Sequence, residues 1–292
     1  MNTVTAKKRV FITGANGFVG TRAMAYFAQQ PDWEVFAFPS EVTRRGDSGE
    51  IADVLLSNHA DYLIHTAAIS DTGLCEREPE ASFRANVELP LAFCRACEKT
   101  RVRLAAFSSD QVYNGCTEEG PYPEDAVLHP QNVYGRHKLQ AEIDGLSLCP
   151  DAVFLRAEWM YDFPVYGQKK RTHFLYNVLH AATENRTLAF SQNTFRGITY
   201  VRSAAEKLAE VVNLPGGVYN FGSENSLSVY DTAAAALRAF GLEERIPALL
   251  RADENGKRHN LWVSLDKLRG YGVDFSDTAE DFVRCAADYG WN

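Results

Sequence analysis

Tyr134 and Lys138 are the residues of this sequence whose types and spacing best suggest proton-transfer chemistry. They stand four residues apart, and on a helix this spacing puts both side chains on one face. A lysine ammonium beside a tyrosine favours the phenolate, so we expect the pKa of Tyr134 to fall below its usual value of about 10. Such a tyrosine exchanges a proton with a substrate oxygen near neutral pH. Y-x-x-x-K alone is common by chance, and a solvated helix face is the alternative.

Gly14, Gly17 and Gly20 stand three residues apart near the start of the chain, behind the short apolar run 10–12. The run predicts a buried strand, and the residues after the glycines predict a helix. Glycines let a backbone approach a phosphate, while the N–H groups and the positive dipole end of a helix face the anion. The first gap is one residue wider than in the dinucleotide-binding pattern G-x-G-x-x-G. We expect a dinucleotide pyrophosphate to lie over Asn16, Gly17, Phe18 and Val19.

The residues after the second predicted strand, 33–38, indicate which dinucleotide binds. An acidic residue there would hydrogen-bond the adenosine ribose and repel a 2′-phosphate. This chain has Ser40 there, with Arg44 and Arg45 close behind, which favours NADP. Because Glu41 is nearby and both arginines could simply be solvated, NAD stays open as the alternative.

Strands and helices alternate through the first half of the sequence. Residues 62–68 predict a strand that runs into a small-residue turn, where a cofactor can lie close. Residues 80–99 predict a long helix, 102–107 a buried strand that ends in serines, and 132–142 the helix with the tyrosine and lysine. This alternation predicts an α/β fold with a doubly wound parallel sheet, whose ligands bind at the carboxyl ends of the strands.

The pattern loosens after residue 161. Helices are predicted here over 174–183, 203–213, 229–240 and 278–289. We expect a Rossmann-type NAD(P)-binding domain over 1–162, to which segments around 187–222 return. Residues 163–292 are then mainly a smaller C-terminal α/β lobe that binds the substrate, with the substrate cleft between the two.

Composition excludes several classes of protein. The chain has 292 residues, 46% of them hydrophobic, and a formal net charge of −8, which argues against a general nucleic-acid binder. Of its six cysteines only Cys94 and Cys97 form a C-x-x-C, without a second ligand pair, so we expect reduced, packed thiols and no metal. No segment has the apolar length of a signal peptide or a membrane span, which predicts a soluble cytoplasmic protein. A homodimer is compatible with the sequence.

Together these landmarks resemble the extended short-chain dehydrogenase/reductase family, and within it the dTDP-4-dehydrorhamnose reductases and their close relatives. The resemblance spans nearly the whole chain, and its motifs are more specific for fold and cofactor than for the sugar. Besides the glycine turn and Y-x-x-x-K, the matching positions are 65–68, 86, 108–113, 121–122, 130–135, 155–161, 217–221 and 258–268.

The resemblance implies hydride transfer from a nicotinamide to a carbonyl carbon, with Ser109, Tyr134 and Lys138 as the catalytic set. Ser109 would hydrogen-bond the keto oxygen, Tyr134 would protonate it, and Lys138 would bind the nicotinamide ribose and tune Tyr134. This arrangement suits a developing alkoxide, which needs donors already aimed at it. The further residues that the resemblance assigns are Thr66, Ala67, Ala68 and Ser108 for the cofactor and Asp110, Val112, Trp159 and Arg196 for the substrate.

Four departures from the reductase pattern cluster where sugar and nucleotide should bind. Gln111 replaces an aromatic residue, Ala157-Glu158 replaces Thr-Ser, and His173 replaces an asparagine. The stretch 194–201 resembles the arginine-containing strand of sugar-nucleotide epimerases. These departures leave the sugar and the nucleotide open, but not the cofactor class.

Three functions follow from the resemblance. The first is the NAD(P)-dependent reduction of a 4-keto sugar nucleotide. The second is a sugar-nucleotide 4-epimerase, which would hold NAD tightly and recycle it. The third is a non-catalytic NADP-binding protein like the regulatory subunit of methionine adenosyltransferase. The complete Ser109, Tyr134, Lys138 set favours an enzyme.

If Arg44 and Arg45 read a 2′-phosphate, NADPH should bind more tightly than NADH. Losing one charge-assisted hydrogen bond to the phosphate costs about 1.5–3 kcal/mol, so each arginine should contribute roughly tenfold or more to the preference. Dissociation constants for the two cofactors measure it. An equal or tighter value for NADH would show that the arginines do not contact the 2′-phosphate.

Overall fold

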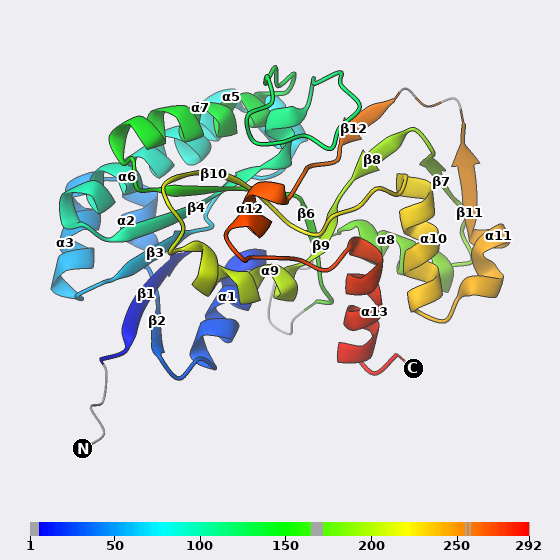
Figure 1. Cartoon of the computed structure of the whole chain (residues 1–292), viewed down its shortest axis with the longest axis horizontal. Coiled ribbons are helices and arrows are strands. Elements are labelled where there is room, and N and C mark those ends of the chain that lie inside the picture. Colours follow the sequence, from blue (N-terminus) through cyan, green and yellow to red (C-terminus); the bar gives the residue numbers. More distant parts are fainter. Residues whose placement is uncertain (1–5, 165–171, 255, 257, 292) are drawn as a thin grey trace. The chain divides into compact units, whose positions relative to one another are not determined.

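The computed structural model describes residues 6–164, 172–254, 256 and 258–291, and its largest sheet has six strands (Figure 1). The strand order is β10-β5-β4-β3-β1-β2, and the pairings β1–β2, β1–β3 and β3–β4 are parallel. Because the chain runs from β1 to the edge at β2 and then crosses back to β3, the sheet is wound in both directions. This confirms the predicted α/β fold class. The strands are β1 (Lys8–Thr13), β2 (Trp33–Ala37), β3 (Tyr62–His65), β4 (Arg103–Ser109), β5 (Val153–Ala157) and β10 (Gly217–Phe221).

Helices cover both faces of this sheet. In Figure 1, α3, α6 and α7 lie on one side of the sheet and α1 and α9 on the other. Apolar residues of α3 and α6, among them Leu55 and Phe93, form one buried cluster with Leu63 of β3 and Leu104 of β4. The helices are α1 (Phe18–Ala28), α2 (Ser40–Arg45), α3 (Ser48–Ser57), α4 (Thr72–Arg77), α5 (Pro79–Phe83), the π-helix η1 (Arg84–Glu88), α6 (Leu89–Thr100), the 3-10 helix η2 (Asp110–Tyr113), α7 (Val133–Leu148) and α9 (Val201–Val211).

The chain divides into two compact units. The first comprises residues 1–115, 128–156 and 205–219, and the second 116–127, 157–204 and 220–292. The domain boundary after residue 162 stays a prediction; in the structure the unit changes after residue 156.

The second unit has small parallel strand pairs and its own core. The pairs are β6–β9, β7–β11 and β8–β12. Tyr161, Phe174, Leu237 and Phe282 are among the buried residues that join its strands to α8, α10 and α13. The elements are β6 (Trp159–Tyr161), α8 (Phe174–Thr183), β7 (Leu188–Ser191), β8 (Thr194–Arg196), β9 (Ile198–Tyr200), α10 (Val229–Ala239), η3 (Glu243–Arg245), α11 (Ile246–Leu249), β11 (Leu250–Asp253), β12 (His259–Leu261), α12 (Asp266–Gly270) and α13 (Thr278–Asp288).

The long helix predicted over 80–99 is interrupted in the structure. It consists of α5, the π-helix η1 and α6, with Pro90 in the first turn of α6. Because proline has no backbone N–H, it cannot donate to the carbonyl of Asn86, and the chain widens to a π-turn there.

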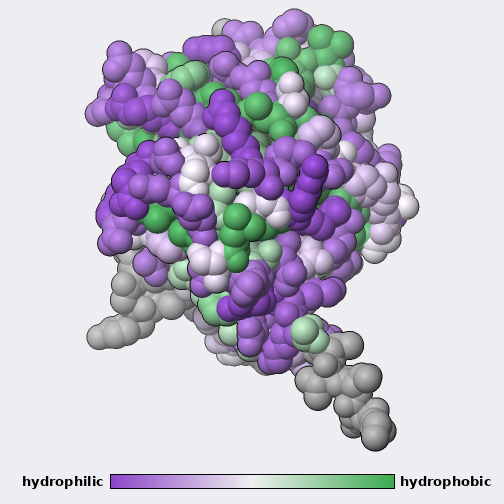
Figure 2. Space-filling model, turned by 90° about the vertical axis from the view of Figure 1, so that its left-hand side faces the viewer, coloured by the Kyte–Doolittle hydropathy of each residue, from purple (hydrophilic) through white to green (hydrophobic). Residues whose placement is uncertain are grey.

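The hydrophobic residues on the surface visible in Figure 2 are dispersed. On the face shown in Figure 2, hydrophobic residues occur in small groups among hydrophilic ones, as on ordinary protein surfaces. Within the described residues, no helix combines the length and the apolar character needed to cross a bilayer.

Gly20 should tolerate no side chain, because α1 passes directly over the preceding turn. A Cβ at Gly20 would overlap the carbonyl oxygen of Gly14 and lie 2.7 Å from its carbonyl carbon. Overpacking typically costs 1–3 kcal/mol, so Gly20→Ala should lower the free energy of unfolding by about this much or more. Gly270→Ala is the control, because a Cβ there meets nothing within 4 Å and alanine favours a helix. Similar thermal unfolding of both variants would contradict the prediction.

Candidate functional site

The turn between β1 and α1 is tightly closed. Gly14 has a φ of 62°, in the left-handed region, and its carbonyl oxygen accepts a hydrogen bond of 2.7 Å from the N–H of Gly17. A side chain on Gly14 would press against Thr66, since a Cβ would lie 2.8 Å from the Thr66 hydroxyl. Each glycine of the motif therefore has a steric reason, and the turn lies against the carboxyl end of β3.

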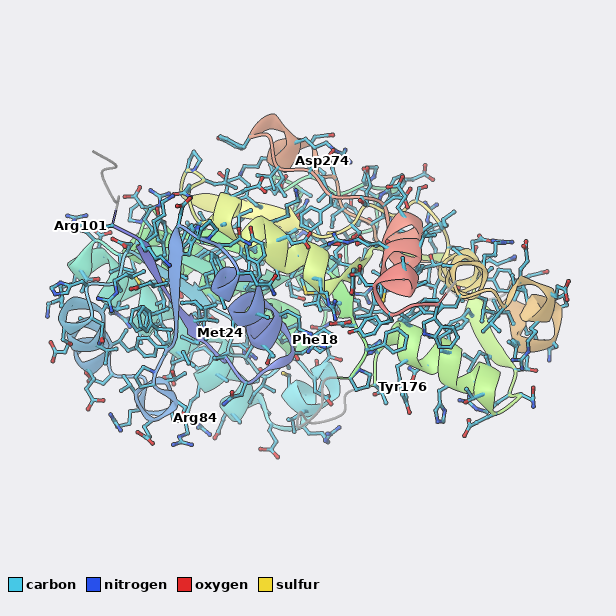
Figure 3. All side chains as sticks on the ribbon, turned by 90° about the horizontal axis from the view of Figure 1, so that it is seen from below. Phe18, Met24, Arg84, Arg101, Tyr176 and Asp274 are labelled. Carbon is cyan, nitrogen blue, oxygen red and sulfur yellow. The ribbon has the colours of Figure 1, made fainter. Side chains whose placement is uncertain are left out.

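The predicted pyrophosphate-binding residues Asn16, Gly17, Phe18 and Val19 lie at the N-terminus of α1. This helix has no side-chain cap and no acidic residue in its first turn. By contrast, α3 and α7 are capped by Asp47 and Asn132. An open helix N-terminus without a carboxylate suits an anionic ligand. Figure 3 shows Phe18 at the start of α1, with Met24 farther along the helix.

Thr13 joins β1 to the end of β3. Its hydroxyl oxygen accepts hydrogen bonds from the N–H groups of Thr66 (3.1 Å) and Ala67 (3.3 Å), and lies 2.9 Å from Nδ1 of His65. Since the oxygen already accepts two bonds, its own proton is donated to Nδ1, which makes His65 a neutral Nε2–H tautomer. Burial, and then the Lys138 charge, lower the pKa of His65 to about 3, consistent with this tautomer. The predicted cofactor residues Thr66 and Ala67 are thus fixed by a buried network, and Ala68 follows them.

The predicted 2′-phosphate residues lie on α2, directly after β2. Ser40, Arg44 and Arg45 are exposed, and the Nε of Arg45 pairs with Glu50 at 2.6 Å. An exposed pair of this kind contributes at most about 1 kcal/mol, so the Arg45 side chain can exchange partners.

Ser109, Tyr134 and Lys138 come together in the first unit. Ser109 ends β4, and its side chain is hydrogen-bonded to the hydroxyl of Tyr134 on α7. One turn farther along α7, the Lys138 ammonium donates a 2.8 Å hydrogen bond to the carbonyl oxygen of Phe107 and lies 5.8 Å from the centre of the Tyr134 ring. Two hydroxyls and an ammonium therefore meet at the carboxyl end of β4.

The expected decrease in the pKa of Tyr134 is wrong for this structure. Burial raises that pKa, and the hydrogen bond between Tyr134 and Ser109 opposes the rise without cancelling it. Burial also lowers the pKa of Lys138 to about 8, against the effect of Glu142 and Cys75. The desolvation of both groups outweighs their mutual interaction, so the neutral phenol is the resting state and is ready to donate a proton.

The N-terminus of α7 is held by groups that the sequence reasoning did not single out. Asn132 caps the helix by accepting a 2.6 Å hydrogen bond from the N–H of Gly135, and Glu76 accepts one of 2.6 Å from Val133. A side chain on Gly135 would overlap the backbone oxygen of Gln111, so this glycine lets α7 approach η2. The motif Y-G-x-x-K contained this signal, because a glycine in a first helical turn indicates close packing.

A second group of polar side chains lies against α7 through His137. Asn86, in the π-helix η1, donates hydrogen bonds to the backbone oxygen of Ile69 (3.0 Å) and to the hydroxyl of Ser82 (3.2 Å). The Ser82 hydroxyl also lies 2.9 Å from Nδ1 of His137, the neighbour of Lys138. Asn86 belonged to the sequence resemblance, but its contacts become apparent only in the fold.

The predicted substrate residues are divided between the two units. Asp110 and Val112 are buried in η2 of the first unit. Trp159 and Arg196 lie together in the second unit, with the Arg196 guanidinium 3.5 Å from the centre of the Trp159 ring. Trp159 is 47% exposed, whereas Arg196 is 4% exposed.

Glu158, one of the departures from the reductase pattern, is accommodated by its neighbours in the second unit. Its carboxylate is buried and accepts a 3.0 Å hydrogen bond from the N–H of Gly197. A Cβ at either Gly197 or Gly222 would overlap this carboxylate. The larger acidic residue is thus accommodated by two glycines.

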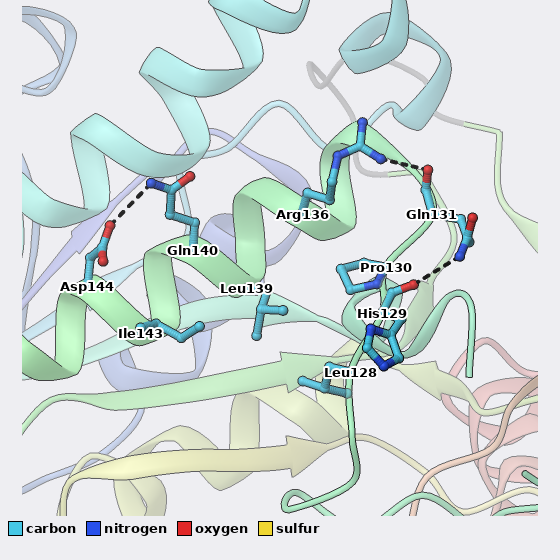
Figure 4. Close-up of a pocket in the computed structure, with 9 residues that line it drawn as sticks. All are labelled: Leu128, His129, Pro130, Gln131, Arg136, Leu139, Gln140, Ile143 and Asp144. Atoms are coloured by element: carbon cyan, nitrogen blue, oxygen red, sulfur yellow. Dashed lines mark hydrogen bonds between the residues drawn. The ribbon is translucent and has the colours of Figure 1, made fainter. Parts of the chain in front are cut away.

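Two other features of the first unit are not part of the Ser109, Tyr134 and Lys138 site. Cys94 and Cys97 are buried, and burial raises the pKa of the Cys94 thiol to about 12. Figure 4 shows a pocket of about 480 Å³ on α7, lined among others by Leu139, Gln140 and Ile143. These side chains lie on a different face of α7 from Tyr134 and Lys138, so the pocket does not reach the hydroxyl pair.

Comparison with known protein families shows the family of this chain. The model of the RmlD substrate binding domain matches residues 8–257. The chain belongs to this family. The resemblance to the extended short-chain dehydrogenase/reductases is thereby confirmed.

Several curated relatives of this RmlD-family chain are named dTDP-4-dehydrorhamnose reductase, which supports a reductase, and a regulatory subunit is also among the relatives. The dTDP-4-dehydrorhamnose reductase of Mycolicibacterium smegmatis is 27% identical over 82% of this chain and 72% of its own length. The spore coat polysaccharide biosynthesis protein SpsK of Bacillus subtilis is 26% identical over 85% of both chains. Methionine adenosyltransferase 2 subunit beta of Danio rerio is 25% identical over 82% of this chain and 76% of its own.

Solved structures show the same fold. A dTDP-4-dehydrorhamnose reductase from Bacillus anthracis, in complex with NADP, has a TM-score of 0.83 at 19% identity and covers 97% of this chain and 99% of its own. The UDP-glucose 4-epimerase of Thermotoga maritima, with UDP-glucose, has a TM-score of 0.77 at 15% identity, over 97% of this chain and 98% of its own.

The buried ammonium of Lys138 should make stability depend on pH above about 8. The pKa of Lys138 is about 8 in the folded chain against 10.5 as the ordinary value, so between these values the unfolded chain binds more protons. Stability therefore rises with pH across this window, by at most about 1.4 kcal/mol per pH unit from this group. Lys138→Met should lose this contribution, whereas Lys99→Met, at an exposed site, should retain it. Denaturant unfolding from pH 7.5 to 10.5 tests the difference, and identical curves for Lys138→Met and the unmodified chain would contradict it.

Proposed function

We propose that this chain is an NADPH-dependent reductase of a 4-keto sugar nucleotide, with dTDP-4-dehydrorhamnose as its substrate. The observation that carries the proposal is the hydroxyl pair of Ser109 and Tyr134 beside the Lys138 ammonium, in the unit that also has the glycine turn. Relatives named dTDP-4-dehydrorhamnose reductase support the choice of sugar and nucleotide.

The chain's residues fit the cofactor at three places. The uncapped N-terminus of α1 suits the pyrophosphate, the turn after β3 suits a cofactor lying across the sheet edge, and Ser40 and Arg44 suit a 2′-phosphate. Lys138 would hold the nicotinamide ribose, and NAD is the alternative cofactor. The chemistry supplied by bound NADPH is hydride donation to the carbonyl carbon.

The hydroxyl pair can manage the proton that this reduction requires. Ser109 would donate a hydrogen bond to the keto oxygen, and Tyr134 would transfer its phenolic proton to the same oxygen as the C–O⁻ charge develops. The raised pKa of Tyr134 keeps this proton in place at neutral pH. Lys138 would stabilise the phenolate that remains until a proton returns from solvent.

In the second unit, Trp159 would contact the sugar nucleotide with its exposed ring, while Arg196 would meet the diphosphate or support Trp159 from beneath. The distance of 3.5 Å between Arg196 and the Trp159 ring favours the supporting role. Asp110 and Val112 would shape the sugar side of the first unit from η2. The homodimer and a cytoplasmic location are further parts of this proposal.

Oxidation of NADPH, followed at 340 nm as in any assay of this cofactor, tests the reaction itself. With dTDP-4-dehydrorhamnose the chain should consume NADPH and form one reduced sugar nucleotide per NADPH. Matched reactions with UDP-glucose and NAD test the epimerase alternative. Binding of NADPH without turnover of any 4-keto sugar nucleotide would instead favour a regulatory protein.

Tyr134→Phe keeps the ring's packing but removes the transferable proton. General acid catalysis contributes typically 10²–10⁴-fold, so kcat should fall by about that factor while the Kd for NADPH stays within about twofold. Ser109→Ala should cost less, because it removes one of two donors at the same oxygen. Tyr271→Phe, at an exposed site, is the control. Unchanged turnover in Tyr134→Phe would refute this role.

A further inference from the structure

Glu142 and Arg156 form a buried ion pair next to the hydroxyl pair. Both residues are nearly inaccessible to solvent, at 1% and 3% exposure. The guanidinium donates from Nε to both carboxylate oxygens, at 3.1 and 3.2 Å, and from Nη2 to Oε2 at 2.8 Å. A pair with this geometry is fully formed and rigid, because both charged groups are satisfied by each other.

The pair is attached to the residues before and after Ser109. The hydroxyl of Ser108 donates to Oε1 of Glu142 at 2.5 Å. Arg156 donates from Nη1 to the hydroxyl of Tyr113, at the end of η2, at 2.8 Å. Both flanks of the segment that bears Ser109 are therefore connected to one charged pair.

Glu142 also belongs to the same face of α7 as Tyr134 and Lys138, since the three residues stand four apart. It is the larger of two influences that keep Lys138 charged, the other being Cys75 of α4. His65 of β3 also lies close enough to feel the Lys138 charge, but it is neutral. Arg156 of β5 pairs with the Glu142 carboxylate at 2.8 Å.

We propose that Glu142 is a positioning residue: held by Arg156, its carboxylate fixes Ser108 and hence Ser109 at the end of β4, and keeps the buried Lys138 ammonium charged. Its part in turnover rests on the proposed reductase function, but its effect on Lys138 does not. Replacing the carboxylate by an amide should make the ammonium lose its proton at a lower pH, because an opposite charge is removed from a poorly solvated site.

The charge state of Lys138 can be read without substrate or cofactor. Lysine labelled with ¹³C at Cε gives an NMR signal whose shift follows deprotonation, and its loss in Lys138→Met assigns the signal. In the unmodified chain the signal should titrate near pH 8. In Glu142→Gln the midpoint should move down by about one pH unit or more. Asp144→Asn, on another face of the same helix, should leave it unchanged.

Glu142→Gln leaves a buried arginine without its partner, which destabilises the fold. A second variant keeps the test possible if Glu142→Gln does not fold. Glu142→Gln/Arg156→Met removes both charges and replaces the guanidinium by an apolar side chain. The Lys138 midpoint should again fall, by less than in the single variant, because Arg156 no longer repels the ammonium. An unchanged midpoint in whichever of the two variants is folded would overturn the proposal.

Measurements of turnover then distinguish the role of Glu142 from the proposed reductase function. If the chain reduces a 4-keto sugar nucleotide, the alkaline limb of kcat/KM should move to lower pH together with the NMR midpoint. A purely structural role of Glu142 would lower activity equally at all pH values and leave the midpoint in place. A shifted midpoint in a chain that reduces no keto sugar would refute the reductase and retain the effect on Lys138.

Discussion

Burial of the Lys138 ammonium against the carboxyl end of β4 is the constraint on which the first unit's site depends. An ammonium in this position loses most of its hydration, and the chain compensates with a backbone carbonyl from Phe107 and a carboxylate one helical turn away. These contacts fix the position of α7 along β4. Because Tyr134 precedes Lys138 by one turn, the same contacts bring its hydroxyl to Ser109.

The glycine turn depends on a steric constraint. α1 begins directly over Gly14, and Gly20 contacts the turn from which the helix starts. Thr13 and His65 then hold the turn against the end of β3. The open helix N-terminus and the proton-donating hydroxyls thus belong to one sheet edge, as expected where parallel strands end.

Local signals allowed the fold class and the pairing of Tyr134 with Lys138 to be predicted, whereas Ser109 joined them through the family resemblance. Strand and helix periodicity, glycine spacing and the four-residue interval depend on short stretches of chain. The direction of the Tyr134 pKa could not be predicted in this way, because desolvation depends on everything packed around the side chain. Glu142 and Arg156 escaped notice for a similar reason: fourteen positions separate them, and only the fold brings them into contact. Likewise, the stacking of Arg196 on Trp159 could not be foreseen from either residue's neighbours.

The Glu158 carboxylate has a consequence for how this chain could have diverged from its relatives. It fills the volume in which side chains at positions 197 and 222 would begin. Glutamate at 158 in this position therefore favours glycine at both other positions, because a side chain at either would displace the carboxylate, whereas a small residue at 158 would leave a void there. The three positions are therefore expected to be epistatic, because the cost of a side chain at 197 or 222 depends on which residue occupies 158. A homologue that carries only part of this set would be expected to have a differently shaped second unit at this point.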